Sequence, residues 1–152
     1  MHQPTMDGVV VTPLAKLADP RGWLTELFRD DELPPGFDPV MGYISVTHPG
    51  VARGPHEHAD QSDGFAFVSG SFQLHLWENR RGKPFTSAVL EVGEANPVFV
   101  IVPPGVVHAY RNVGDSDAFV LNFPDRLYKG PGKSESADEI RHEADPNSRF
   151  QL

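Results

Sequence analysis

The sequence predicts an all-β protein, a sandwich or barrel of short strands. Several segments alternate apolar and polar side chains with a period of two, which is the pattern of half-buried strands. Turn-forming residues separate these segments, with 14 Gly and 15 Pro among 152 residues. Long helical periodicity is missing, and many short strands spaced by turns are typical of β-sandwiches and barrels.

The N-terminal part is predicted to be extended chain broken by a turn. Residues 8–17 carry a run of valines before a proline, and residues 19–22 (DPRG) have turn chemistry. A short segment of mixed polarity follows over residues 23–29. Residues 30–39 then form a polar, proline-rich loop.

The middle of the chain supplies most of the expected strands. They are residues 43–47, 65–68, 71–76, 87–92, 98–102 and 119–123. Residues 71–76 alternate strictly, as a half-buried strand does, whereas residues 98–102 (VFVIV) are a continuous apolar run. A Pro-Pro-Gly turn stops that run, so it is expected to be a short buried strand.

The whole chain, residues 1–152, fits one domain. We divide it into an N-terminal strand segment (8–29), a barrel core (about 40–128) and a C-terminal extension (129–152). Residues 129–136 are rich in Gly, Ser and Lys and are expected to be a flexible connection. Residues 137–143 are expected to form one short helix, with His142 on the surface.

Charge and composition exclude several classes of protein. The net charge is −8, which disfavours a nucleic-acid partner because phosphate backbones would be repelled. No cysteine is present, so disulfides and thiolate metal sites are excluded. The start lacks a signal-peptide pattern, and no apolar run approaches the ~20 residues of a membrane span. We therefore expect a cytoplasmic protein without a membrane partner.

Two stretches carry the residues best suited to chemistry. In the first, His56 and His58 are two residues apart, so on a strand both imidazoles point to one face. Asp63 follows five residues later. In the second, a Pro-Gly turn places His108 at the start of a new strand. Tyr110 comes two residues later, so on that strand its side chain points to the same face as His108. Tyr110 is therefore a candidate for stacking on a sugar or base.

These two stretches resemble the paired signature motifs of the cupin superfamily. The resemblance implies a double-stranded β-helix, the cupin jelly roll, for this chain. In metal-binding cupins the matching side chains are His56, His58, Asp63 and His108. Three imidazoles and one carboxylate suit Fe, Mn, Ni or Zn.

A narrower resemblance covers most of residues 10–128. Residues 19–26 (DPRGWLTE) and 50–56 (GVARGPH) are similar to segments of the dTDP-4-dehydrorhamnose 3,5-epimerase family. That family acts without a metal on dTDP-linked 4-keto-6-deoxy sugars. The resemblance implies that His56 removes the proton next to the ketone and that His108 supports the developing charge.

The same resemblance assigns binding residues. Arg21 and Glu26 take the positions that help hold the nucleotide, often from a neighbouring subunit, and Arg53 is expected near phosphate. Asn122 aligns with the family's tyrosine proton donor, and no carboxylate near the C-terminus is an obvious partner for the base. His58 gives the chain an Arg-Gly-x-His-x-His element similar to that of sugar 3,4-ketoisomerases, in which two imidazoles shuttle a proton.

The chemistry implied by the resemblance is physically coherent. A proton next to a ketone becomes acidic only when the enolate oxygen is stabilised, so a base and a charge-stabilising group must face one site. We predict an isomerase or epimerase without a cofactor, with His56, His58 and His108 as catalytic residues. The predicted binding residues are Arg21, Glu26, Arg53, Tyr110 and Asn122. A homodimer that exchanges its N-terminal strand is expected.

Two alternatives stay open at this point. One is an enzyme that depends on a divalent transition metal held by His56, His58, Asp63 and His108. The other is a non-catalytic binder of a sugar or sugar nucleotide that has lost its acid, because a fold does not fix a function.

Overall fold

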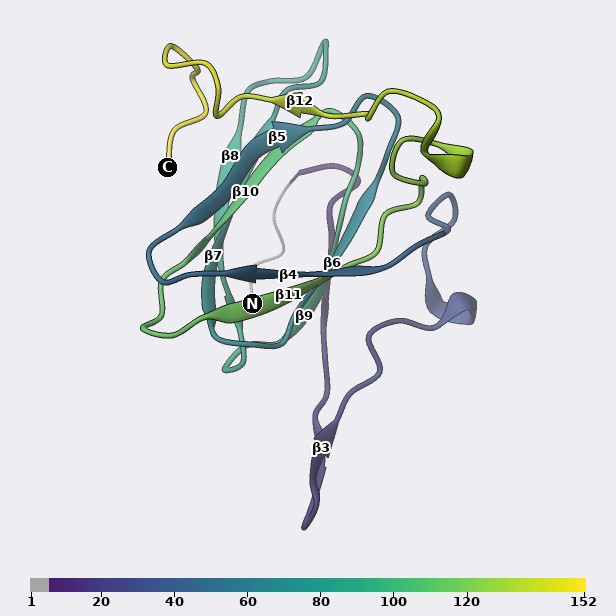
Figure 1. Ribbon diagram of the computed structural model, residues 1–152, viewed down its shortest axis with the longest axis vertical. Coiled ribbons are helices and arrows are strands. Elements are labelled where there is room, and N and C mark those ends of the chain that lie inside the picture. The colour runs from purple at the N-terminus through teal and green to yellow at the C-terminus, as the bar shows by residue number, and fades with distance from the viewer. Residues whose placement is uncertain (1–5) are drawn as a thin grey trace.

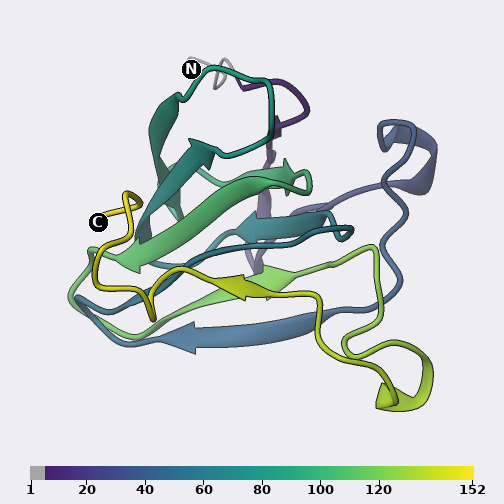
Figure 2. The ribbon, with the colours of Figure 1, turned by 90° about the horizontal axis from the view of Figure 1, so that it is seen from above.

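Two antiparallel β-sheets face each other in the computed structural model, which describes residues 6–152 (Figures 1 and 2). One sheet has the strand order β1-β9-β6-β11-β4, and the other has the order β12-β5-β10-β7-β8. This architecture confirms the predicted all-β fold. Residues 1–5 of the predicted domain lie outside the described residues.

The strands match the expected segments closely. The first sheet consists of β1 (Val10–Pro13), β9 (Val98–Val102), β6 (Asp63–Phe67), β11 (Ala118–Asn122) and β4 (Tyr43–Thr47). The second consists of β12 (Ile140–Arg141), β5 (Ala52–Glu57), β10 (Val106–Asn112), β7 (Ser71–Glu78) and β8 (Ser87–Gly93). Each of the six strands predicted in the middle of the chain overlaps one of these.

The core forms where the inner faces of the sheets meet. On β9, Val98, Val100 and Val102 face this core, while Phe99 and Ile101 point to the outer face. Side chains of the N-terminal segment and the following loop, including Phe28 and Phe37, cover that outer face. Both faces of β9 are therefore buried, which explains its continuous apolar run.

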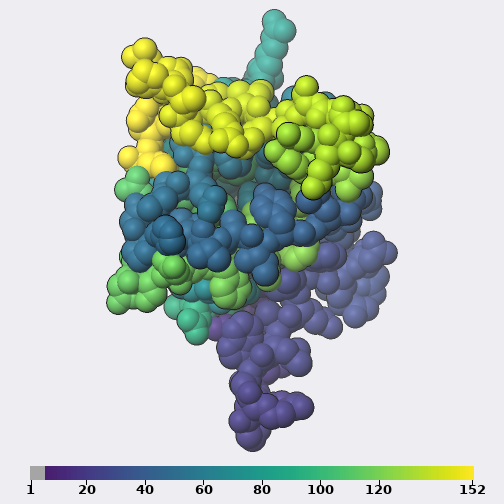
Figure 3. Space-filling model, in the orientation of Figure 1, coloured from purple at the N-terminus to yellow at the C-terminus, as the bar shows by residue number. Residues whose placement is uncertain are grey.

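The outer face of the second sheet is covered from the other end of the chain. Trp77 on β7 and Val107 and Ala109 on β10 form a small cluster with Phe150. The burial of Trp77 agrees with its apolar character. The C-terminal segment therefore packs across this sheet, and Figure 3 shows it along the upper edge of the molecule.

The N-terminal segment contains a small hairpin that leaves the barrel. β2 (Leu17–Asp19) pairs with β3 (Gly22–Leu24), and the hairpin projects from the body (Figure 1). β1 pairs with β9 of its own chain. A short 3₁₀ turn, η1 (Asp30–Glu32), follows. The exchange of an N-terminal strand between subunits stays a prediction.

The prediction of a helix over residues 137–143 is wrong. This segment instead contains β12, whose residues Ile140 and Arg141 pair with Glu57 and His56 of β5. The edge of β5 supplies hydrogen-bonding partners that local propensity does not reveal. The preceding connection contains a 3₁₀ turn, η2 (Pro131–Lys133). Within residues 6–152, no helical segment has the length and apolar character to cross a bilayer.

Candidate functional site

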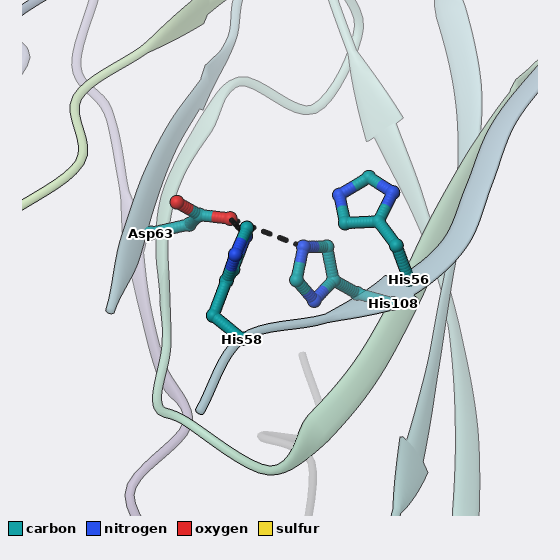
Figure 4. A group of neighbouring side chains, drawn as sticks. All are labelled: His56, His58, Asp63 and His108. Carbon is teal, nitrogen blue, oxygen red and sulfur yellow. Dashed lines mark hydrogen bonds and ion pairs between the residues drawn. The ribbon is translucent and has the colours of Figure 1, made fainter. Parts of the chain in front are cut away.

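Three imidazoles from two strands converge inside the barrel (Figure 4). His56 on β5 lies opposite His108 on β10, and their ring centroids are 4.5 Å apart. His58 follows β5 directly, on the same side as His56, with centroids 5.6 Å apart. The alternation of His56, Glu57 and His58 along the strand produces this convergence, as the sequence predicts.

A β-bulge at Gly54 adds Arg53 to the same wall. The register between β5 and β10 shifts between His108 and Tyr110, so Arg53 and His56 both line the cavity although they are three residues apart. Gly54 has a φ of +90°, and a Cβ there would lie 2.6 Å from the carbonyl oxygen of His108. Only glycine fits this close approach.

Asp63 connects two of the imidazoles. It begins β6 in the facing sheet and is buried. Its Oδ2 lies 2.8 Å from Nε2 of His58 and 3.1 Å from Nε2 of His108. Gln61 donates to the other carboxylate oxygen of Asp63 at 2.7 Å. Asp63 is therefore part of the site, not a solvated loop residue.

Backbone carbonyls fix the orientation of the same two rings. Nδ1 of His58 donates to the carbonyl oxygen of Asp138, and Nδ1 of His108 donates to that of Val106. A carbonyl can only accept, so both Nδ1 atoms carry protons. Both Nε2 atoms consequently face Asp63.

Electrostatics give His56 and His58 opposite character. Burial disfavours charge on His58, but the hydrogen bond and negative charge of Asp63 outweigh it and raise the pKa of His58 to about 9. Burial and the neighbouring His108 and His58 lower the pKa of His56 to about 3. Although burial opposes ionisation of Asp63, hydrogen bonds from His108 and His58 hold its pKa well below the usual range.

A cavity of about 1360 Å³ opens beside this cluster. His56 and His58 line it, whereas His108 is only 1% exposed and lies behind them. The floor and walls of the cavity carry both aromatic side chains, such as Phe65 and Tyr110, and polar ones. The volume exceeds what a monosaccharide needs and suits a drug-sized or larger ligand.

Three of the predicted binding residues line the cavity, namely Arg53, Tyr110 and Asn122. Arg53 donates to the hydroxyl of Thr47 at 3.0 Å and to the carbonyl of Val46 at 2.6 Å. Both acceptors are neutral, so within residues 6–152 no carboxylate is hydrogen-bonded to the Arg53 guanidinium.

The other two predicted binding residues do not reach the cavity of their own chain. Arg21 lies at the tip of the β2–β3 hairpin, pairs with Asp19 at 2.6 Å and has a side chain that is 87% exposed. Glu26 lies just beyond the hairpin, 3.9 Å from Arg29. Neither lines the cavity in the described part of the chain.

The structure adds residues that sequence reasoning missed. Tyr43 on β4 lies opposite Asn122 on β11 and lines the cavity. Burial and the charge of Asp63 raise the pKa of Tyr43 well above its usual range, so the phenol keeps its proton. The parity of Tyr43 with Ser45 and Thr47 was the available signal, but it did not say which face was inward.

His142 is not the free surface residue that was expected. Its Nε2 lies 2.9 Å from a carboxylate oxygen of Glu57, and its ring packs against Phe150 with centroids 4.6 Å apart. Glu57 points to the outer face of β5, opposite His56 and His58. This pair therefore fastens the C-terminal segment to the outer face of β5.

Comparison with known proteins identifies the family. Residues 17–135 match the model of the polysaccharide biosynthesis C-terminal domain. The chain belongs to this family. It is 34% identical over 129 residues to the probable low-salt glycan biosynthesis epimerase Agl13 of Haloferax volcanii, covering 82% of each chain. It is 35% identical over 126 residues to the spore coat polysaccharide biosynthesis protein SpsL of Bacillus subtilis, covering 81% of this chain and 82% of that protein.

Solved structures show the same fold for this member of the family. A dTDP sugar isomerase from Desulfovibrio desulfuricans has a TM-score of 0.78 and 22% identity, with 92% of this chain and 87% of that chain covered. ChmJ, a 3'-monoepimerase from Streptomyces bikiniensis in complex with dTDP, has a TM-score of 0.80 and 18% identity, with 99% of this chain and 78% of that chain covered.

The sugar 3,4-ketoisomerase QdtA from Thermoanaerobacterium thermosaccharolyticum also matches, with a TM-score of 0.69 and 18% identity over 92% of each chain. Together, these matches confirm the predicted fold and the resemblance to epimerases and isomerases of dTDP sugars. The names of the relatives agree with an enzyme of the epimerase or isomerase type.

Proposed function

We propose that this protein is an epimerase that removes the proton next to the ketone of a nucleotide-linked 4-keto-6-deoxy sugar. The observation that carries the proposal is His56, a neutral imidazole that lines the cavity and has no hydrogen-bond partner among residues 6–152. A neutral imidazole that lines the cavity presents a lone pair that can accept a proton. The family and the names of its relatives supply the substrate class.

His58 is suited to stabilise the enolate that forms. Asp63 keeps His58 positively charged, and the two rings lie 5.6 Å apart, so the charge stands beside the carbon that His56 would deprotonate. A fixed charge in a water-poor site stabilises developing negative charge strongly. His108 is buried behind both rings, and we assign it the supporting role of holding Asp63 in place.

Tyr43 is suited to return a proton from the opposite side. His56 belongs to the β5–β10 sheet, whereas Tyr43 belongs to the facing sheet, so the two approach the cavity from different walls. Proton removal by His56 and delivery by the Tyr43 hydroxyl would invert one carbon. Exchange with water then restores both groups. Tyr43 thus replaces the acid that is missing at Asn122.

Binding of the nucleotide is assigned to the cavity wall and to a second copy of the chain. Arg53 provides a cation for the diphosphate that has no carboxylate partner among residues 6–152, and Tyr110 and Asn122, which line the same cavity, would contact the sugar. We propose a homodimer in which the projecting hairpin carries Arg21 and Glu26 to the neighbouring cavity. A cytoplasmic location, where nucleotide sugars are available, completes the proposal.

The test is solvent deuterium incorporation into a dTDP-linked 4-keto-6-deoxy sugar. We expect label at a carbon next to the ketone, and a His56→Asn variant should lose about 10²–10⁴-fold of the rate. The matched control is His75→Asn, because His75 stacks on Trp77 on the other face of its sheet. Binding of the nucleotide sugar without any label would instead favour the non-catalytic binder.

One observation favours a metal-dependent enzyme as a second candidate. The ligand atoms of His56, His58, Asp63 and His108 all lie within 4.8 Å of one another. The carbonyl bonds to Nδ1 of His58 and His108 also leave Nε2 facing inward. A metal-bound histidine usually donates its other ring N–H to an outer acceptor of this kind. These residues fit a divalent transition metal, which would polarise the ketone oxygen.

Metal analysis of the purified protein separates the two candidates. For the first candidate, we expect less than stoichiometric Fe, Mn, Ni and Zn and full deuterium incorporation in the presence of a chelator. Stoichiometric metal that is lost in Asp63→Ala, together with inactivation by the chelator, would replace the first candidate with the second.

A further inference from the structure

The C-terminal segment reaches the site at one residue, Asp138. β12 pairs with β5, placing Ile140 opposite Glu57 and Arg141 opposite His56. Asp138 lies two residues before β12 and therefore stands over His58, at the end of β5. Figures 1 and 3 show the segment along the upper edge of the molecule, with β12 beside β5.

Asp138 accepts hydrogen bonds from four consecutive residues. One carboxylate oxygen accepts from the backbone N–H of Ala59 at 2.8 Å, and the other accepts from those of Asp60 and Gln61, both at 2.9 Å. Its backbone carbonyl accepts from Nδ1 of His58. A single residue thus holds both the ring and the turn that follows it.

The turn held by Asp138 also reaches the other side of His58. Gln61 donates from its side chain to Oδ1 of Asp63, whose Oδ2 faces Nε2 of His58. Loss of the Asp138 carboxylate would therefore disturb the partners of both ring nitrogens of His58. The bonds of the carboxylate to residues 59–61 help to fix where the Asp138 carbonyl lies, so their loss should also weaken the contact of that carbonyl with His58.

The rest of the segment is anchored independently of Asp138. His142 bonds to Glu57, which is 7% exposed, and Phe150 packs on Trp77 with ring centroids 5.9 Å apart. Because these anchors lie on the outer face, removing the Asp138 side chain should leave the segment attached.

We propose that Asp138 is the positioning residue of this site, fixing the orientation and the Nδ1 proton of His58 for catalysis. The kinetic part of this inference rests on the proposed function. The structural part concerns only how His58 is held. Groups that orient metal-bound histidines are typically worth about 10–100-fold in affinity or activity, and we expect a loss of the same size here.

The first arm of the test is a proton NMR spectrum of protein labelled with ¹⁵N-histidine. In the wild type, the Nδ1–H of His58 should give a downfield resonance protected from water exchange. Asp138→Ala should lose it. Asp138→Asn, whose amide oxygen still accepts hydrogen bonds, should retain part of it. This arm needs no substrate, so it stands even if the proposed reaction is wrong.

The second arm is turnover of the dTDP-linked 4-keto-6-deoxy sugar. Asp138→Ala should lower kcat about 10–100-fold with KM changed less than about threefold, and Asp138→Asn should be intermediate. The matched control is Asp145→Ala, which removes a carboxylate that caps a turn at Asn147 in the same segment. It should match the wild type in both arms.

The inference is overturned if the His58 resonance persists unchanged in Asp138→Ala. It is also overturned if Asp145→Ala produces the same losses, since the effect would then be general loosening of the segment. A lost resonance in protein that turns over no sugar supports the positioning of His58 and counts against the proposed function alone.

Discussion

His56 and His58 differ in charge although they are two residues apart on one strand. The difference comes from Asp63, which contacts Nε2 of His58 and has no hydrogen bond to His56 among those of residues 6–152. One carboxylate therefore divides a pair of identical side chains into a neutral base and a cation. This division is the physical basis for assigning them separate roles.

The role of Tyr43 as acid predicts a specific split of activities. In Tyr43→Phe, His56 still removes the proton, so deuterium incorporation with retained configuration should continue. Formation of the inverted sugar should fall about 10²–10⁴-fold. Both are measured by NMR of the sugar in deuterated water. Tyr128→Phe, which alters another cavity tyrosine, is the control, and undiminished inversion in Tyr43→Phe would refute the assignment.

The charge on His58 predicts how stability depends on pH. Its pKa in the folded state is about 9, above the usual 6.5, so its stabilisation is complete below pH 6.5 and lost as the pH rises toward 9. Urea unfolding with a chelator should show the free energy of unfolding falling over that window. His58→Asn should flatten the fall, whereas His48→Asn, at an exposed position, should retain it. An equal fall in both variants would contradict the ion pair.

At the scale of elements, β5 organises the site. Its inner face carries His56, its bulge brings Arg53 to the same wall, and its outer face holds the C-terminal segment through Glu57. Its edge is completed by β12. One strand therefore connects the base, the expected phosphate contact and the segment that carries Asp138.

Gly54 is the residue on which this strand depends. Gly54→Ala places a Cβ 2.6 Å from the carbonyl of His108 and requires a left-handed backbone, so it should destabilise the fold by more than about 2 kcal/mol. Gly82→Ala shares the positive φ but meets nothing within 4 Å, and should cost about 1–2 kcal/mol. Urea unfolding measures the free energy of unfolding of both variants. Equal losses would show that the close approach at Gly54 is not the cause of its destabilisation.

The strands of the middle of the chain were predictable because each is long enough to show its own periodicity. Residues 71–76 and 98–102 are the clearest cases, and they correspond to β7 and β9. β12 was missed because it has only two residues and exists through pairing with β5. Local propensity favoured a helix there, and tertiary hydrogen bonds decided otherwise.

At the scale of the whole molecule, the β2–β3 hairpin projects from the body and exposes apolar side chains (Figure 1). Leu17 and Leu24 face each other on it and are 61% and 57% exposed, beside Trp23 at 46%. Exposed apolar side chains on a projecting element are typical of an interaction surface. They support the homodimer proposed above, in which Arg21 would enter a neighbouring cavity.

If the dimer shares its sites, a variant that dissociates into monomers should also bind the nucleotide more weakly. A Leu17→Asp, Leu24→Asp double variant should elute as a monomer in chromatography with light scattering and should bind the nucleotide more weakly, because Arg21 no longer reaches it. Val89→Asp, on an exposed position of β8, is the control and should stay dimeric. A monomeric wild type with full binding would dismiss the shared site.

The sequence by itself determined the strand pattern, the shared face of His56 and His58, and the resemblance that placed Arg53 near them. These follow from spacing along one strand or from contiguous motifs. The tertiary structure alone decided that Asp63 turns inward, that the carbonyl of Asp138 accepts a hydrogen bond from His58, and that Tyr43 faces the cavity opposite Asn122. Such contacts join residues on different strands, and no local pattern records which distant groups a folded chain will bring together.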